Sequence, residues 1–358
     1  MHNCAEDAQI DQSSAESTLS ADLHLPAEVV TDIDSAEVDR AIEKFRQRCC
    51  CKLIVDSASD FSPAVLRRLG IEMIPLSYAT PEGESFDDLW ASQSAHDFYE
   101  GMRKDPDVHY TTSAVPVGRY IEVFERAAKE GVPTIYLGIT AGLSSSLRNA
   151  ELAAEEIHEH YPDFELYIID SCCDSAAIEL LAVEAMRLAA QGFSAEEVYN
   201  WAQDARYFVH GYFTLDNLSA LAAGGRIPPA AAQIGGKLDV KPELTYDTNG
   251  ALSMRGICRG RRKALRAILE DFKDNYCGDP TLPIAIVSSD AEKDADWLEG
   301  QLRKQKGCEG VLVIRSQVSP ILGCHVGPGM VALIFWGGDR REKLSFTDRI
   351  ARRLRDKQ

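Results

Sequence analysis

The chain has 358 residues, enough for two ordinary domains with a core each. Its composition is globular, with 45% hydrophobic and 26% charged residues. A formal net charge of −18 argues against nucleic acid or anionic membranes as main partners, because phosphate binding depends on clustered cations. Near residue 1 no basic segment precedes an apolar stretch, and no apolar run is long enough to cross a bilayer. We therefore expect a cytoplasmic protein.

Residues 1–48 are predicted to form an acidic tail and one appended helix. No Lys or Arg precedes Arg40, and the opening is rich in Asp, Glu, Ser and Ala. Asp34 is a candidate N-cap, with Glu37 three residues later. The apolar residues that then recur on one helical face are Val38, Ile42 and Phe45.

Residues 49–208 are predicted to form a three-layer α/β domain with a parallel sheet. Short apolar runs alternate with helical stretches, which is typical of helices packed on both faces of such a sheet. Ser194 and Glu197 predict a capping box for one further helix. The strand-like runs are KLIVD, IEMIPLSY, TIYLGIT and ELYIIDS, starting at Lys52, Ile71, Thr134 and Glu165. The helical runs are SAHDFYEGMRK, VGRYIEVFERAAKE and SSLRNAELAAEEIHEHY.

Residues 209–338 are predicted to form a smaller α+β domain with a partly antiparallel sheet. Asn249-Gly250 is a strong hairpin signal. The strand-like runs are HGYFTL, KPELTYDTNGALSMRGI, LPIAIVSSD, GVLVIRSQ and MVALIFWG, and the helical runs are RRKALRAILEDF and KDADWLEGQLRKQ. Residues 339–358 form a basic amphipathic segment that we expect to be a helix docked on the body. A transient membrane-surface contact or a subunit contact is the alternative.

The ten cysteines indicate reduced thiols. Cys49 to Cys51 are consecutive, Cys172 and Cys173 are adjacent, and no CxxC pair or His/Cys ligand spacing occurs. We therefore expect neither a metal nor a cofactor.

Two hydroxyl-rich loops are candidate ligand sites. One contains Thr112 and Ser113, and the other runs from Ser144 through Ser145 into a helix. Ligands of open α/β sheets bind beyond the carboxyl ends of the strands, where helix N-termini offer free N–H groups to anions. The alternative is that the serines only cap their helix.

Glycine-rich turns present further polar candidates. His325 precedes a turn built from Gly327, Pro328 and Gly329, which either holds the imidazole toward a ligand or is an ordinary tight turn. Two glycines place Arg226 on another turn. A basic cluster at a helix start opposes the helix dipole, so it indicates either an anionic partner or phosphate, or equally a solvated charged face. The cluster consists of Arg259, Arg261, Arg262 and Lys263.

Nucleophilic and phosphate-loop chemistry is not indicated. GLSSS lacks the second glycine of a GxSxG elbow, and neither GxxxxGK[ST] nor GxGxxG occurs in a suitable context. The polar groups suit holding a ligand rather than attacking it.

Taken in order, these segments resemble the DegV family of bacterial fatty-acid-binding proteins over roughly Lys52 to Gly337. The motifs that carry the resemblance are IVDSASDF, TTSAVP, ITAGLSSSLRNA, IIDS, LSALAAGGRIP, KPELTYDTNGALSMRGICRGRRKA and HVGPG. No single motif is decisive, but the ordered set is specific.

The resemblance implies two α/β domains with an acyl chain between them. Members of the family resemble the lipid-binding subunit of bacterial fatty acid kinase, so the resemblance implies a long-chain fatty acid ligand, no catalytic residues, and a separate ATP-dependent kinase subunit. By motif position, Thr112, Ser144 and His325 match the family's carboxylate-binding residues. The positions matched near the head group or the partner contact are Ser113, Ser145, Arg226, Arg259, Gly327 and Gly329.

The chain departs from the family pattern inside these motifs. Ala114, Val115 and Pro116 stand where the family usually has Gln, Pro and Ser, Thr140-Ala141 replaces Ser-Ser, and Ser145-Ser146 replaces Gly-Thr. These changes bear on loop shape and acyl preference. Two other functions stay open, namely a carrier of another amphiphile and an autonomous hydrolase using Ser144 and His325.

Overall fold

The computed structural model describes residues 36–106, 108, 110–230 and 240–342. The predicted acidic tail, the N-cap at Asp34 and nearly all of the basic segment 339–358 lie outside these ranges. The appended helix is α2, Ala36–Arg48. Arg340–Glu342 forms a single 3₁₀ turn, η3.

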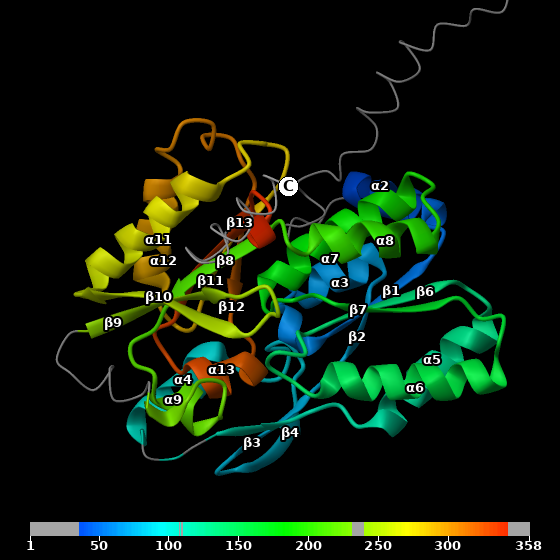
Figure 1. The fold of residues 1–358 in the computed structure, drawn as a ribbon, viewed down its shortest axis with the longest axis horizontal. Helices are drawn as coiled ribbons and strands as arrows, with labels where there is room; N and C mark the ends of the chain where they lie inside the picture. The colour runs from blue at the N-terminus through cyan, green and yellow to red at the C-terminus, as the bar shows by residue number, and fades with distance from the viewer. Residues whose placement is uncertain (1–35, 107, 109, 231–239, 343–358) are drawn as a thin grey trace, which may run out of the picture.

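The first sheet is parallel and has helices on both faces. Its strands lie in the order β2-β1-β6-β7, and β1 and β6 are almost continuously buried, as expected of a sheet covered on both sides. The strands are β1 Lys52–Asp56, β2 Glu72–Ile74, β6 Thr134–Gly138 and β7 Leu166–Asp170. Figure 1 shows α5 (Val117–Glu130) and α6 (Ser146–His160) below this sheet, and α3 (Pro63–Leu69), α7 (Ala176–Ala190) and α8 (Ala195–Ala205) above it. The three-layer arrangement predicted for this part of the chain is confirmed.

The second sheet is mixed, with six strands in the order β10-β9-β8-β13-β11-β12. Only the β11–β12 pair is parallel. The strands are β8 Val209–Thr214, β9 Val240–Tyr246, β10 Leu252–Arg259, β11 Ile284–Ser288, β12 Val313–Gln317 and β13 Val331–Trp336. Helices α11 (Arg261–Asn275) and α12 (Glu292–Leu302) pack on it. Asn249 and Gly250 lie in the β9–β10 turn, where Gly250 takes a φ of 75°, so the predicted hairpin is confirmed.

Helix α7 joins the two sheets into one body. It contacts β1 and β6 of the first sheet and β8, β11 and β13 of the second. Fourteen of its fifteen residues are buried, which fits a mostly apolar helix that packs on several sides. The predicted boundary between residues 208 and 209 falls between α8 and β8. Because α7 is shared by both sheets, that boundary stays a prediction.

A third, small sheet was not expected. The run IEMIPLSY was predicted as one strand, but it divides between β2 and β3 (Ser77–Thr80), which belong to different sheets. Pro75 lies at the division and cannot donate a ladder hydrogen bond. β3 pairs with β4 (Gly83–Phe86) and with β5 (Thr111–Ser113), so the strand that carries Thr112 lies at an edge of this sheet.

Three short helices surround the seam between the sheets. They are α4 (Ala95–Lys104), α9 (Ser219–Ala223) and α13 (Pro320–Val326). The segment before Gly327 is thus a helix that starts with proline, and His325 lies in its last turn. The capping box predicted for Ser194 and Glu197 is present at the start of α8.

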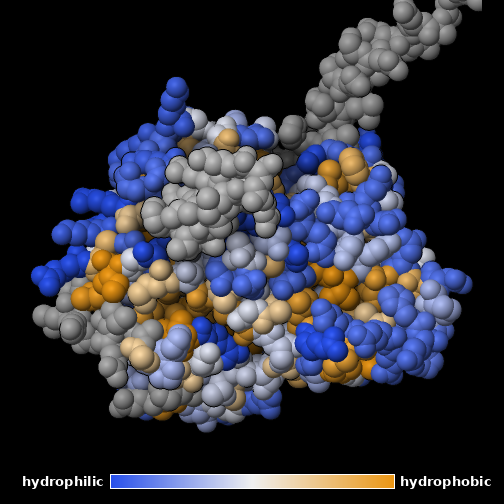
Figure 2. All heavy atoms as spheres, in the orientation of Figure 1, coloured by the Kyte–Doolittle hydropathy of each residue, from blue (hydrophilic) through white to orange (hydrophobic). Residues whose placement is uncertain are grey.

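The outer face is mostly hydrophilic. Figure 2 shows hydrophobic residues reaching the surface mainly in a band across the middle and lower part of the view, with a smaller group at the upper right. No helix within the described ranges is both long and apolar enough to span a bilayer.

Candidate functional site

A cavity of about 210 Å³ lies at the seam between the two sheets. Its apolar lining comes from both sides, which explains why no single stretch of sequence reveals it. The apolar lining residues are Leu76, Ile139, Leu143, Phe213, Leu221, Leu252, Ile321, Leu322, Val326 and Met330. A wall of this composition is suited to a hydrocarbon chain.

All three predicted carboxylate-binding residues line this cavity. Thr112 on β5 and His325 on α13 are in contact, with 2.8 Å between Oγ1 and Nε2. Ser144 precedes α6, where its Oγ accepts the Ser146 N–H at 3.1 Å. Ser144 therefore also contributes to the cap of α6, as the alternative interpretation predicted, and it lines the cavity at the same time.

His325 is buried, with 8% of its surface exposed. Burial, with a smaller contribution from Arg226, lowers the pKa of His325 to about 4, so the ring is neutral at pH 7. A neutral ring carries one N–H. When that hydrogen is on Nε2 it donates to Thr112, whose own hydroxyl hydrogen is then free for a ligand oxygen.

Arg226 lies where the cavity meets a second, outer groove of about 590 Å³. Thr112, His325 and Val326 line both spaces as well. The Arg226 Nε donates to the Leu143 carbonyl at 3.2 Å. The Arg226 guanidinium is thus fixed at the junction, within reach of an anion in either the cavity or the outer groove.

The remaining predicted positions do not all line the cavity. Ser113 and Ser145 line the cavity, and Gly327 lines the outer groove. Gly329 lines neither space, and its N–H donates to the Ser289 carbonyl at 2.7 Å. Arg259 lies exposed at the end of β10 and also lines neither. The structure therefore does not bring Arg259 to the cavity.

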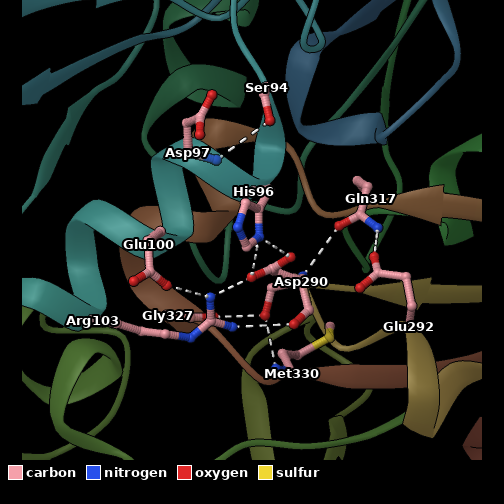
Figure 3. Close-up of polar contacts among 11 residues, drawn as sticks. Ser94, His96, Asp97, Glu100, Arg103, Asp290, Glu292, Gln317, Gly327 and Met330 are labelled. Carbon is pink, nitrogen blue, oxygen red and sulfur yellow. Dashed lines mark hydrogen bonds and ion pairs between the residues drawn. The ribbon is translucent and has the colours of Figure 1, made fainter.

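The turn after His325 is held by the end of β11. The Ser289 hydroxyl donates to the Gly327 carbonyl at 2.7 Å and accepts the Met330 N–H at 2.7 Å. Figure 3 shows the next residue, Asp290, between His96 and Arg103 of α4. The His96 Nδ1 lies 3.0 Å from Asp290 Oδ1, and Arg103 forms an ion pair with the same carboxylate. We call this three-residue contact the α4 clasp.

Burial opposes charge on Asp290, but the hydrogen bonds from Arg103 and His96 outweigh it and hold the pKa of Asp290 below its usual range. The hydrogen bond to Asp290 in turn raises the pKa of His96. The clasp thus ties α4 to the loop beside the outer groove.

A buried carboxyl next to the cavity wall connects the two sides of the seam. Asp60 Oδ2 accepts the Ser175 hydroxyl at 2.5 Å, and its Oδ1 accepts the Ser319 N–H at 2.8 Å. Ser319 is the N-cap of α13, so Asp60 fixes the start of the helix that carries His325. Burial raises the pKa of Asp60 to about 7, although the hydrogen bonds from Ser175 and Ser319 oppose that shift.

Three polar residues of the cavity wall were missed from the sequence, Asp174, Ser175 and Tyr246. Asp174 lies in the β7–α7 loop, and Tyr246, at the end of β9, donates its hydroxyl to the Asp174 carboxylate. The rule that drew attention to the loops after other strands, that ligands lie beyond carboxyl ends, applies equally to the loop after β7.

Within the described ranges no group of three or more His, Cys, Asp or Glu side chains could hold a metal ion. The cysteines of those ranges are free thiols.

The fold and the site define a class: a two-lobed α/β protein with a largely apolar cavity at the seam, flanked by neutral hydroxyl and imidazole groups. Residues 51–337 match the family model described as "Uncharacterised protein, DegV family COG1307". The chain therefore belongs to the DegV family, and the resemblance seen in the sequence is confirmed.

The matches to known relatives extend over almost the full length of those relatives. A DegV domain-containing protein of Clostridium perfringens is 29% identical over 290 residues, which span 81% of this chain and 98% of that protein. A solved structure from Thermotoga maritima, reported to reveal a fatty acid binding function, is 25% identical with a TM-score of 0.68, covering 80% of this chain and 99% of that one. The fatty acid kinase B3 protein of Streptococcus pneumoniae, solved with linoleic acid, has the same fold at 21% identity, with a TM-score of 0.69 and coverage of 80% and 99%.

Proposed function

We propose that this protein binds a long-chain fatty acid in the seam cavity and presents its carboxylate to a separate ATP-dependent kinase subunit in the cytoplasm. The observation that carries the proposal is the junction itself. Thr112 and His325 line both the apolar cavity and the outer groove, so a carboxylate held by them is reachable from outside while its chain is enclosed. The fatty acid binding reported for the Thermotoga maritima relative supports the ligand class.

The two ends of the ligand contribute differently. Hydrogen bonds from Thr112, Ser144 and His325 to a carboxylate contribute about 0.5–1.5 kcal/mol each, and somewhat more because the acceptor is charged. Burying the chain contributes about 0.8 kcal/mol per methylene, before the costs of ordering and association. The chain therefore drives affinity, and the neutral donors set where the carboxylate points.

The site does not support an autonomous hydrolase. A serine nucleophile needs a base within hydrogen-bond reach. In the described structure the Ser144 hydroxyl donates to Ser146 Oγ at 3.0 Å, and His325 contacts Thr112 instead. In this proposal the phosphoryl transfer belongs to the partner subunit.

The proposal is tested on purified protein by mass spectrometry of extracted lipid, followed by retention of isotope-labelled oleate. We expect long-chain fatty acids in the extract. Thr112→Val should lower oleate retention several-fold, whereas Thr111→Val should not, because Thr111 lines the outer groove but not the cavity. With an ATP-dependent kinase subunit and ATP, the loaded protein should yield acyl phosphate. A protein that carries no fatty acid and takes up none when it is supplied would overturn the proposal.

A further inference from the structure

The cavity contains a second pair of polar residues besides the groups assigned to the carboxylate. It consists of Asp174 and Tyr246, which line the same cavity as Thr112 and His325. Within the described residues the only hydrogen bond to the Asp174 carboxyl comes from the Tyr246 hydroxyl, which donates to Oδ1. Oδ2 has no protein donor there, and because Asp174 lines the cavity this oxygen can accept a hydrogen bond from a ligand.

Asp174 is enclosed by protein but open to the cavity. Burial raises the pKa of Asp174 to about 6, although the hydrogen bond from Tyr246 acts to lower it. The residue nevertheless keeps part of its surface accessible, and the cavity that it lines accounts for this surface. A saturated chain would place only methylene groups against a carboxyl that is ionised above pH 6.

The pair is held in place on both sides. A Cβ on Gly211 would lie 2.7 Å from the Tyr246 ring, so only glycine leaves room for this tyrosine. Next to Asp174, Ser175 has φ 58° and ψ −151°, a region that is strained for any residue with a side chain. Its N–H donates to the Ala58 carbonyl at 2.7 Å, and its hydroxyl is bound by Asp60. Backbone strain kept by surrounding bonds is characteristic of functional loops.

Helix α13 gives the approximate spacing of the two polar sites. Its N-cap, Ser319, is tied through Asp60 to Ser175, beside Asp174, while His325 lies in its last turn. Ile321 and Leu322 line the cavity between these ends. Seven helical residues rise by about 10 Å. In a chain whose carboxylate lies at His325, Asp174 would therefore face the middle of the chain.

We propose that the Asp174–Tyr246 pair binds a hydroxyl group in the middle of the acyl chain, so that the ligand is a mid-chain hydroxy fatty acid. The inference rests on the proposed function and specifies its ligand class. A hydroxyl donates to the free oxygen of Asp174 and stays neutral, so it satisfies the carboxylate at a smaller desolvation cost than an ammonium group. The apolar residues around the pair contact the chain on both sides of the hydroxyl.

The test compares four ligands at pH 8: stearate, 2-hydroxystearate, 10-hydroxystearate and 10-ketostearate. The keto acid has an oxygen at the same carbon but no hydrogen to donate. We expect 10-hydroxystearate to bind about tenfold more tightly than the other three. Equal or tighter binding of stearate or of 10-ketostearate would overturn the inference while leaving the proposed function intact. If none of the four acids binds, the proposed function fails.

Variants assign the preference to the pair. Asp174→Leu should abolish the hydroxyl preference and improve stearate binding, and Tyr246→Phe should reduce the preference. Asp216→Asn is the control, because Asp216 lines the outer groove and not the cavity. A hydroxyl preference that survives in Asp174→Leu would overturn the assignment to this residue. Comparing the ligands on the wild-type protein alone keeps the inference testable even if a variant fails to fold.

Discussion

Gly224 and His325 touch so closely that a Cβ built on Gly224 would lie 2.2 Å from Nδ1 of His325. Gly224 has a φ of −74°, an ordinary angle for any residue. Glycine is therefore required here because a side chain would not fit, and not because of the backbone angle. The contact is with the Nδ1–Cε1 edge of the ring, next to the Nε2 atom that meets Thr112.

Gly224→Ala should displace the imidazole and break its contact with Thr112. Loss of one hydrogen bond of about 1 kcal/mol predicts roughly fivefold weaker fatty acid binding, measured by titration. Gly118→Ala is the control, because a Cβ there meets nothing within 4 Å and alanine favours the helix. Unchanged binding in Gly224→Ala would mean that the ring position does not matter for the ligand.

The α4 clasp predicts a local change in dynamics. Asp290→Asn removes the charge but suits the left-handed φ of 53° at this position. We expect faster amide hydrogen exchange in α4 and a stability loss of about 0.5–1 kcal/mol, since the pair with Arg103 is partly exposed. Glu100→Gln is the control, because Glu100 pairs with Arg103 within α4 only. Equal exchange in α4 of both variants would argue against the clasp.

Asp60 predicts a pH dependence of stability. Its folded-state pKa of about 7 lies above the ordinary 3.8, so the native state holds a proton that the unfolded chain releases. The stabilisation is complete below about pH 4 and is lost as the pH rises through 7. Asp60→Asn lacks this titration, so its stability relative to wild type should improve from pH 4 to pH 8, by at most about 4 kcal/mol.

Urea unfolding across this pH range measures the effect. Asp97→Asn, which removes an exposed carboxylate from α4, controls for a general change in charge. A wild-type-minus-variant difference that stays constant from pH 4 to pH 8 would contradict the assignment to Asp60.

Arg340 predicts a large loss of stability for a conservative change. Its buried guanidinium donates to the carbonyls of Cys172 and Arg206 on one side of the seam and of Tyr246 and Asp247 on the other. Lysine cannot reproduce that planar arrangement of donors. Arg340→Lys should lower the unfolding free energy by about 2–3 kcal/mol, measured by urea denaturation. The same change at Arg266, which lies exposed on α11, should cost about 0.5 kcal/mol or less.

Much of the fold could be predicted because its elements have local signals. The capping box at Ser194 and the hairpin at Asn249-Gly250 depend on residues a few positions apart, and both are present. The loops that carry Thr112 and Ser144 were found because carboxyl ends of strands and helix starts are readable along the chain.

The remaining features depend on contacts between distant segments. Helix α7 has no polar face, so no periodicity marks it. The glycines in and after α13 favour a turn, so this helix was not predicted. Its helical form depends on packing against neighbours such as α9 and on the hydrogen bond between Asp60 and Ser319. Asp174 and Tyr246 are 72 positions apart, and only the folded chain shows that they share a cavity.

Because α7 packs against strands of both sheets, the two lobes cannot rotate apart without exposing a helix in which fourteen of fifteen residues are buried. A ligand must therefore enter through a small local opening and not through a separation of the two lobes. The short elements at the mouth, α9 and the turn after α13, become the natural gate, and uptake should be limited by their movement and not by domain rotation.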